Sequence, residues 1–192
     1  METPVLSHRF EEAILYANQL HGGQLRKGSQ VPYISHLLGV TALVLEDGGD
    51  EDQAIAALLH DAAEDQGGRK TLAEIRRRFG ERVAKIVDGC TDTYENPKPP
   101  WRERKIAYMD HLRTASKDVR RVSLADKLHN ARSILMDLRR NGDATWKRFN
   151  GGKEGTLWYY RSLVEIFEQV DHSPMVKELA RTVKNIEEIA KD

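Results

Sequence analysis

Apolar side chains recur three and four residues apart through most of the chain, which is the spacing of one face of an α-helix. The segments with this spacing are separated by stretches rich in glycine, proline and polar residues. No stretch shows the sustained alternation of a half-buried β-strand, and the sequence contains no internal repeat. The pattern predicts an all-α fold, a single helical bundle of about nine or ten helices over residues 1–192.

Capping residues mark where several predicted helices begin. Ser7 can cap the first helix and Asp50 the third, and Thr71 with Glu74 has the spacing of a capping box. Glycine pairs and proline-rich stretches mark the connections between helices. The predicted helices cover about residues 7–21, 36–47, 51–65, 71–79, 83–90, 101–114, 119–138, 157–170 and 174–189, and the long connections cover residues 22–35, 91–100 and 142–155.

Composition narrows the class of protein. The chain has 192 residues, 40% of them hydrophobic, which suits one compact domain with a sizeable core. Thirty basic and thirty acidic side chains cancel, so no overall field attracts the chain to DNA or to an anionic membrane. The single cysteine, Cys90, excludes an internal disulfide framework, and no basic-then-apolar leader or membrane-length apolar run is present. These features predict a soluble cytoplasmic protein without a DNA or membrane partner, and they leave its oligomeric state open.

Residues 54–65, AIAALLHDAAED, place a histidine and three acids at the end of an apolar run. At ~100° per residue, a helix sets Glu64 above His60 and Asp65 above Asp61. Burying such carboxylates beside an imidazole costs several kcal/mol unless a cation balances their charge, and a divalent metal would do so. The alternative is that the helix ends after the apolar run and the acids lie in a solvated last turn, although acids are disfavoured at a helix C-terminus.

A second acidic position lies within the predicted long helix, in the segment DKLHNAR. Asp126 and Asn130 are four residues apart and therefore face the same way. Asp126 adjoins the apolar stripe, so its carboxylate is expected to point inward and to need a partner. That partner could be Arg121 or Arg132 in a structural salt bridge.

Four side chains from three predicted helices could instead share one ion: His36, His60, Asp61 and Asp126. Two imidazoles and two carboxylates form a mixed nitrogen and oxygen set that suits Mn²⁺, Fe²⁺, Zn²⁺ or Mg²⁺ with positions left for water and substrate. The order H…HD…D resembles the signature of the HD phosphohydrolase superfamily.

The resemblance extends to the neighbouring residues. The segments HGGQLRKGSQVPYISH, LLHDAAED and LADKLHNAR resemble, in order and spacing, motifs of the Rel/Spo class of alarmone hydrolases, in particular their small stand-alone forms. The similarity covers about residues 8–170. It implies an all-α HD bundle that removes the 3′-pyrophosphate of guanosine tetra- and pentaphosphate (ppGpp and pppGpp), normally with Mn²⁺ as cofactor.

The resemblance also implies roles for individual side chains. The metal ligands would be His36, His60, Asp61 and Asp126. Glu64 and Asp65 match the acidic pair that positions and deprotonates the attacking water. Arg26 and Lys27 match cations that meet phosphate, and Asn130 matches a residue that contacts the nucleotide.

The chain departs from the family pattern in places. Leu37 stands where the family usually has proline, and QGGRK follows the acidic pair where relatives often carry threonine. Trp158, Tyr159 and Tyr160 lie where the family places an aromatic near the nucleotide, but core packing is the expected role of each one.

The other histidines and a run of three arginines are expected to have structural roles. His8, His21, His111, His129 and His172 fall in no ligand pattern and are expected at the surface or in packing. The run of three arginines at residues 76–78 is expected on a solvated helix face, with RNA binding as the alternative.

Two other functions fit the same ligands. One is an HD phosphohydrolase acting on another phosphorylated nucleotide, such as an NADPH-type phosphatase of dinucleotide cofactors or an enzyme that removes pyrophosphate from modified tRNA ends. The other is a non-catalytic module that senses a nucleotide, against which Glu64 and Asp65 argue, because a sensor does not need to activate water.

Overall fold

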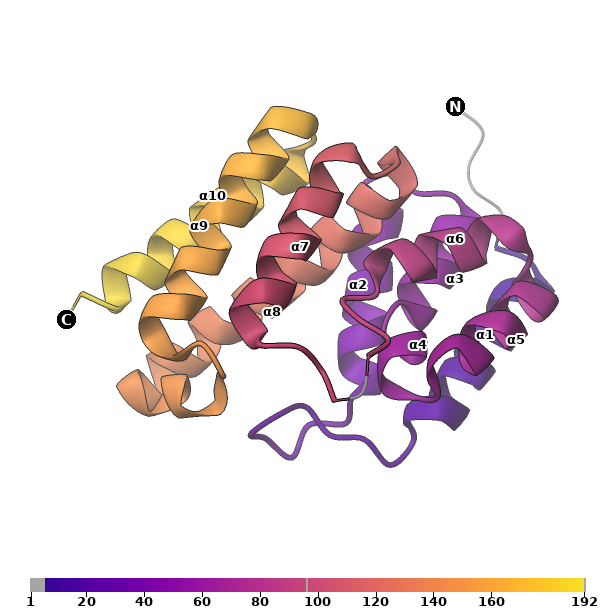
Figure 1. Ribbon diagram of the computed structural model, residues 1–192, viewed down its shortest axis with the longest axis horizontal. Helices are drawn as coiled ribbons and strands as arrows, with labels where there is room; N and C mark the ends of the chain where they lie inside the picture. The colour runs from indigo at the N-terminus through magenta and orange to yellow at the C-terminus, as the bar shows by residue number, and fades with distance from the viewer. Residues whose placement is uncertain (1–5, 96, 192) are drawn as a thin grey trace. The chain divides into compact units, whose positions relative to one another are not determined.

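The computed structural model describes residues 6–95 and 97–191, and within these ranges the regular structure is helical (Figure 1). No β-strand is formed by the described residues, where the only β pairing is an isolated bridge between Leu25 and Pro32. The prediction of an all-α fold is confirmed. The helices are α1 (His8–His21), α2 (Ile34–Glu46), α3 (Glu51–Leu59), α4 (Ala62–Asp65), α5 (Gly68–Phe79), α6 (Glu81–Cys90), α7 (Trp101–Thr114), α8 (Lys117–Asn141), the 3₁₀-helix η1 (Gly142–Arg148), α9 (Gly152–Val170) and α10 (Pro174–Ile189).

The chain divides into two compact units. The first comprises the residues up to Tyr94 together with Ala115–Ala125, and the second comprises Glu95–Thr114 and Asp126–Asp192. The division falls inside α8, so this one continuous helix contributes its first turns to one unit and the rest to the other. Among the described residues, none of the helices combines the length and the apolar character that crossing a membrane requires.

Helix α3 forms the centre of the first unit. Residues 54–59 of α3 are fully buried, and the helix packs against α1, α2 and α6. Such burial follows from the sequence AIAALL, because a helix that is apolar on every side must be covered on every side. The buried helix ends at Leu59, directly before the histidine and acids of the predicted site.

Helix α9 organises the second unit. It packs against α7, α10 and η1, and it buries Leu163, Ile166 and Phe167. Gly151, just before α9, lies so close to Trp101 that an added Cβ would stand 2.7 Å from the indole ring. The small residue lets the ring approach the backbone at the start of α9.

Most predicted helix limits agree with the structure. The Ser7 hydroxyl accepts a hydrogen bond from the Arg9 N–H and caps α1. Asp50 and Gln53 form a reciprocal capping box at the start of α3. These local signals were sufficient because a cap acts within one helical turn.

The prediction of an uninterrupted third helix to Asp65 is wrong. The chain turns at His60 and Asp61, and the single turn α4 follows. The Nδ1 atom of His60 lies 2.8 Å from the Ala57 carbonyl oxygen, which is the acceptor that a continuous helix offers to the Asp61 N–H. Glu64 and Asp65 therefore lie on a separate short helix.

The predicted capping box of Thr71 and Glu74 is also wrong. Helix α5 begins earlier, at Gly68, after Gly67 adopts the left-handed φ of 118° that favours glycine. The Thr71 hydroxyl donates to the Gln66 carbonyl oxygen at 2.5 Å from inside the helix.

The loop or broken helix expected at residues 142–155 is in part the 3₁₀-helix η1, and α9 starts at Gly152 rather than at Leu157. The buried Trp146 anchors η1, and its indole N–H donates to Asp143 Oδ1 at 3.1 Å. A buried aromatic residue thus gives regular structure to a segment whose composition indicates a loop.

Candidate metal centre

Two histidines lie in the interior of the first unit. His36 sits in the first turn of α2 and is 1% exposed, while His60 follows the last residue of α3 and is 2% exposed. Their rings meet edge to face, with centroids 5.3 Å apart. Buried imidazoles at this spacing can direct ring nitrogens at a common point.

The backbone fixes the tautomer of His60. A carbonyl oxygen can only accept, so Nδ1 of His60 donates its proton to Ala57. In the neutral ring this leaves Nε2 with a lone pair, the form in which histidine binds metals. A hydrogen bond from the ring nitrogen that does not bind the metal is the usual means of orienting a metal-binding imidazole.

Asp61 adds a carboxylate beside both rings. Its Oδ2 lies 3.0 Å from His60 Nε2 and 3.6 Å from His36 Nε2. The hydroxyl of Tyr33 donates to the same oxygen at 2.6 Å. A carboxylate oxygen and an imidazole lone pair at 3.0 Å repel each other unless a proton or a cation lies between them, so the donor set fits a metal ion.

Asp126 lies close to the same two histidines. His36, His60 and Asp126 are all buried, and each offers a ligand atom that lies within 4.8 Å of the others. Asp126 follows Ala125 directly in α8, and both residues are buried. Two nitrogen donors and one carboxylate oxygen at this spacing are suitable for a divalent metal.

Two residues of α8 itself contact the Asp126 carboxylate. Asn130, four residues further along the same helix, donates to Oδ1 at 2.5 Å, and Lys127 Nζ lies 2.6 Å from Oδ2. The two arginines considered as its partners pair elsewhere, Arg121 with Asp47 at 2.9 Å and Arg132 with Glu178 at 3.5 Å. The salt bridge of Asp126 is therefore made by the adjacent lysine.

Lys127 has an unusual environment. Its side chain is 14% exposed, and Nζ lies 4.8 Å from the centroid of the Tyr108 ring. Burial by itself lowers the pKa of Lys127, but the nearby Asp126 charge and the Tyr108 and Tyr159 side chains outweigh burial and raise the pKa well above its usual value. The lysine therefore stays charged and balances part of the negative charge of Asp126.

The predicted acidic pair lies on α4. Glu64 is half-buried, and its Oε2 accepts a hydrogen bond from the Asp92 N–H at 3.1 Å. Asp65 is exposed, and its Oδ2 accepts from Gln24 Nε2 at 2.9 Å. Glu64 and Asp65 follow Asp61 by three and four residues, which is about one helical turn.

The predicted phosphate cations lie on the connection between α1 and α2. The Arg26 guanidinium lies 5.6 Å from the centroid of the Tyr33 ring, and Lys27 is exposed. The backbone of this connection is held by hydrogen bonds from Arg26 N to Val31 O at 2.8 Å and from Tyr33 N to Gln24 O at 2.9 Å. Arg26 is thus presented by an ordered turn next to the residue that contacts Asp61.

Sequence reasoning missed three side chains that contact predicted site residues. They are Tyr33, which donates to Asp61, Gln24, which donates to Asp65, and Lys127, which pairs with Asp126. The position of Tyr33 three residues before His36 is a usable signal, because residues at that spacing share a helix face. Gln24 gave no signal, since its partner lies 41 residues away in the chain.

The remaining candidates agree with structural roles. His21 is buried and stacks on Tyr33 with centroids 5.2 Å apart, as expected of a packing histidine. Tyr159 and Tyr160 are buried, and Trp158 meets Trp101 edge to face at 6.1 Å. Cys90 forms no disulfide, and its Sγ lies 3.6 Å from Ser123 Oγ.

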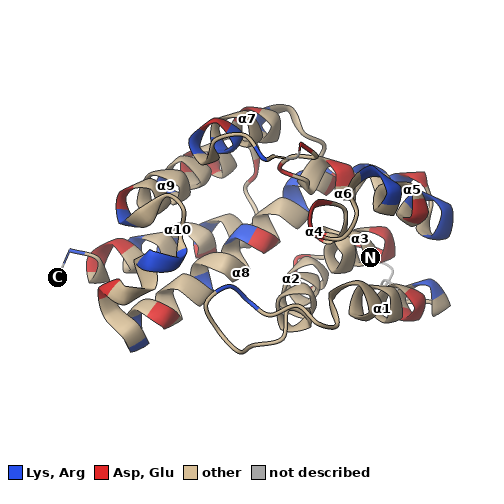
Figure 2. Ribbon diagram, turned by 60° about the horizontal axis from the view of Figure 1, so that its bottom comes forward, with Lys and Arg blue, Asp and Glu red and all other residues tan. Residues whose placement is uncertain are grey.

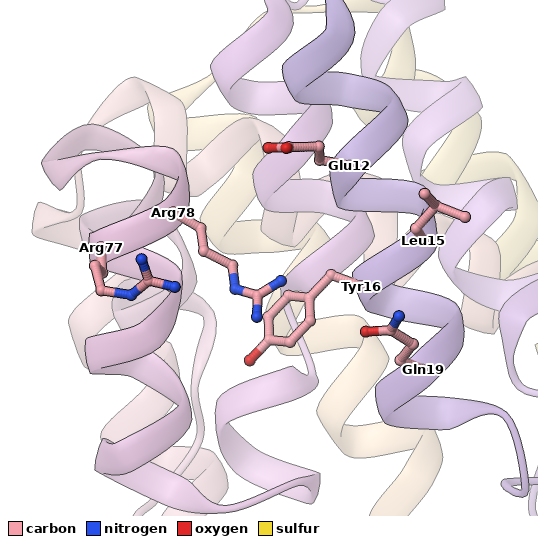
Figure 3. A pocket seen from close by; sticks show the side chains of 6 residues that line it. All are labelled: Glu12, Leu15, Tyr16, Gln19, Arg77 and Arg78. Carbon is pink, nitrogen blue, oxygen red and sulfur yellow. The ribbon is translucent and has the colours of Figure 1, made fainter.

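The arginine run lies in the last turns of α5, a mostly basic helix in which Glu74 is the one acidic residue (Figure 2). Arg77 and Arg78 both bond to Glu74, and these bonds hold the pKa of Glu74 at about 2. Arg78 also lies over the Tyr16 ring at 4.3 Å, on one wall of an open hollow of about 550 Å³ between α1 and α5 (Figure 3). Pairing with acids agrees with the interpretation of a solvated face.

Several curated relatives are similar in sequence to this chain. The chain is 41% identical over 126 residues to the guanosine-3′,5′-bis(diphosphate) 3′-pyrophosphohydrolase MESH1 of Xenopus tropicalis, covering 64% of this chain and 68% of the relative. The MESH1 protein of Homo sapiens is 36% identical with the same coverage. A guanosine-3′,5′-bis(diphosphate) 3′-pyrophosphohydrolase of Aquifex aeolicus is 46% identical over 88 residues, but the match spans 46% of this chain and only 12% of that much longer relative.

Solved structures share the fold. A metazoan orthologue of SpoT that hydrolyses ppGpp superposes with a TM-score of 0.77 at 25% identity, over 94% of this chain and 96% of that one. A protein of Listeria monocytogenes superposes with a TM-score of 0.69 at 32% identity, over 82% of this chain and 99% of that one. The profile of the HD domain family matches residues 13–157, a range that contains every predicted ligand. The chain therefore belongs to the HD domain family and is a relative of the SpoT and MESH1 pyrophosphohydrolases.

Proposed function

We propose that this protein is a metal-dependent pyrophosphohydrolase that removes the 3′-pyrophosphate of ppGpp and pppGpp. The observation that carries the proposal is the convergence of His36, His60 and Asp126, whose ligand atoms lie within 4.8 Å of one another. The MESH1 relatives are guanosine-3′,5′-bis(diphosphate) 3′-pyrophosphohydrolases, which supports the choice of substrate. We also propose that residues 1–192 act as one catalytic domain, because the HD domain match runs through parts of both compact units.

Four side chains would hold the ion: His36, His60, Asp61 and Asp126. Their mixed nitrogen and oxygen donors suit several divalent metals, and the choice of Mn²⁺ rests on the family resemblance. A divalent ion bound there would supply Lewis-acid activation of water and of a phosphate oxygen. The hydrogen bond from His60 Nδ1 to Ala57 keeps the opposite nitrogen available as a ligand.

The acidic pair would handle the proton of the attacking water. Glu64 is half-buried and Asp65 is exposed, and a carboxylate within reach of the water can take its proton. Water adds to the phosphorus next to the 3′ oxygen, the bond between that phosphorus and the 3′ oxygen breaks, and the 3′ oxygen takes up a proton. Guanosine diphosphate and pyrophosphate are the products when the substrate is ppGpp.

Cationic and amide groups would bind the substrate. Arg26 and Lys27 would meet phosphate oxygens and stabilise the charge that moves onto the leaving group. Asn130, held by Asp126, would contact the nucleotide. The proposal includes the cytoplasmic location that the sequence indicates, because a chain with a single cysteine suits a reducing compartment.

A hydrolysis panel with Mn²⁺ tests this function. The purified protein is given ppGpp, pppGpp, NADPH and a tRNA with a terminal pyrophosphate, and the released phosphate species are identified. We expect pyrophosphate from the two guanosine substrates, and removal of metal by a chelator should abolish the release. Faster dephosphorylation of NADPH or tRNA would overturn the substrate, and nucleotide binding without any turnover would indicate a sensing module.

Two variants separate the metal ligands from the acidic pair. Asp61→Ala should lose Mn²⁺, whereas Glu64→Ala should keep Mn²⁺ and lose turnover by roughly 10²–10⁴-fold, the contribution typical of a general base. Glu11→Ala, which removes an exposed acid on α1 with His8 as its partner, is the matched control and should change neither quantity. Equal metal loss in the first two variants would show that these roles are assigned wrongly.

A further inference from the structure

Gln24 lies between the end of α1 and the acidic pair on α4, and it has no role in the function proposed above. Its side-chain amide donates to Asp65 Oδ2 at 2.9 Å. We infer that Gln24 is a positioning residue that holds the Asp65 carboxylate in the orientation needed to act on the attacking water. The inference rests on the proposed function, because it gives Asp65 a part in catalysis.

Three hydrogen bonds fix which way the Gln24 amide points. Its Oε1 accepts from Gln66 Nε2 at 2.8 Å and lies 2.7 Å from His21 Nδ1, while its Nε2 faces Asp65. A carboxylate can only accept, so the amide nitrogen must face Asp65. The amide oxygen then faces His21, and Nδ1 of His21 must carry the proton that it donates.

The residues behind the Gln24 amide are themselves held in place. His21 is 2% exposed and stacks on Tyr33 with centroids 5.2 Å apart. The Gln24 backbone accepts from Tyr33 N and donates to the His21 carbonyl oxygen, both at 2.9 Å. Fixing both the backbone and the amide of Gln24 leaves its nitrogen little freedom to move away from Asp65.

The place of Asp65 in α4 explains what the Gln24 amide contributes. It is the last residue of α4, which has only four residues, and its side chain is exposed. An exposed aspartate at the end of one helical turn can occupy several rotamers, most of which turn the carboxylate away from any one point. A donor on a fixed amide selects one rotamer and lowers the entropy cost of reaching the reactive geometry.

The inference predicts which kinetic quantity changes. The side chain of Gln24 forms hydrogen bonds to His21, Asp65 and Gln66, none of which is a predicted metal ligand, so its loss should affect the chemical step and leave metal binding intact. We expect Gln24→Met, which keeps the length of the side chain without its donor, to lower kcat by roughly 10–100-fold, the cost of a misplaced catalytic group. KM and the Mn²⁺ affinity should stay within about twofold of wild type.

A matched control and a double variant make the test specific. Gln19→Met applies the same change to an exposed glutamine of α1 and should behave as wild type. In an Asp65→Ala background, Gln24→Met should cause no further loss of kcat, because its effect passes through Asp65. An additive loss in the double variant, an unchanged kcat in the single variant or a rise in KM equal to the fall in kcat would overturn the inference.

A structural measurement separates this inference from the proposed function. A crystal structure of Gln24→Met should show Asp65 outside its single wild-type rotamer, or in several, and an unchanged Asp65 would overturn the positioning role. Failure of wild-type protein to release pyrophosphate from ppGpp would overturn the proposed substrate instead. The kinetic comparison would then be made on whichever nucleotide of the panel the wild-type protein hydrolyses.

Discussion

Removing the Tyr33 hydroxyl offers a sharp test of the candidate metal centre. That hydroxyl donates to Asp61 Oδ2 at 2.6 Å, and Oδ2 is also the oxygen that lies 3.0 Å from His60 Nε2. Tyr33→Phe deletes the donor and keeps the ring, so the stack on His21 at 5.2 Å and the edge contact with His36 at 5.6 Å can remain. The change therefore isolates one hydrogen bond to a proposed ligand.

The expected magnitude follows from what such a bond does. Hydrogen bonds to a charged group contribute about 1.5–3 kcal/mol, and loss of a residue that orients a metal ligand typically costs about 10–100-fold in metal affinity. A factor of 10–100 corresponds to about 1.4–2.7 kcal/mol, so the two estimates agree. Tyr33→Phe should raise the Kd for Mn²⁺ by roughly 10–100-fold.

The assay is a direct titration of metal-free protein with Mn²⁺, followed by isothermal calorimetry or by electron paramagnetic resonance of the free ion. Tyr16→Phe is the matched control, because Tyr16 is also a tyrosine of the first unit, but its ring contacts are with Arg78 and Phe79. A Kd for Tyr33→Phe that stays within about threefold of wild type would refute the idea that Tyr33 orients a metal ligand.

Two further predictions concern stability. In Gly89→Ala the new Cβ would stand 2.6 Å from Cγ2 of Val119, so overpacking of about 1–3 kcal/mol should exceed a gain in helix propensity of about 1 kcal/mol. In urea unfolding, Gly89→Ala should lower the free energy of unfolding in the wild-type background and raise it in a Val119→Ala background. Equal losses in both backgrounds would contradict the clash. The hydrogen bond from Arg82 lowers the pKa of Asp118 in the folded protein. This ion pair therefore stabilises the fold fully above the ordinary carboxyl pKa, and the stabilisation is lost as the pH falls through the lowered pKa of Asp118. Urea unfolding of Asp118→Asn between neutral and acidic pH should show a smaller loss of stability than wild type, and a parallel acid profile would count against this ion pair.

The sequence alone predicted most of the helices and named the candidate ligands. Helical spacing of apolar residues gave an all-α fold, and it gave the limits of α7 as Trp101–Thr114, which the structure has. The caps at Ser7 and Asp50 were also correct. These signals are carried by neighbours within one or two turns, so they can be recognised without knowledge of the fold.

Other predictions failed where a side chain or a turn competes with a regular pattern. The third helix stops at Leu59, where the His60 ring bonds to a backbone carbonyl of the last turn. Helix α5 starts at Gly68 because the preceding glycine adopts a positive φ that the capping pattern did not anticipate. Both departures result from local alternatives that have similar free energies, and packing decides between them.

Tertiary structure alone decided which side chains support the predicted site residues. Tyr33 reaches Asp61 across 28 positions of the chain, and Gln24 reaches Asp65 across 41. Periodicity determines the face of a helix on which a residue lies, but it carries no information about which distant segment meets that face. The sequence therefore determined the helices and the ligand types, whereas the hydrogen bonds that orient the carboxylates depend on packing between segments far apart in the chain.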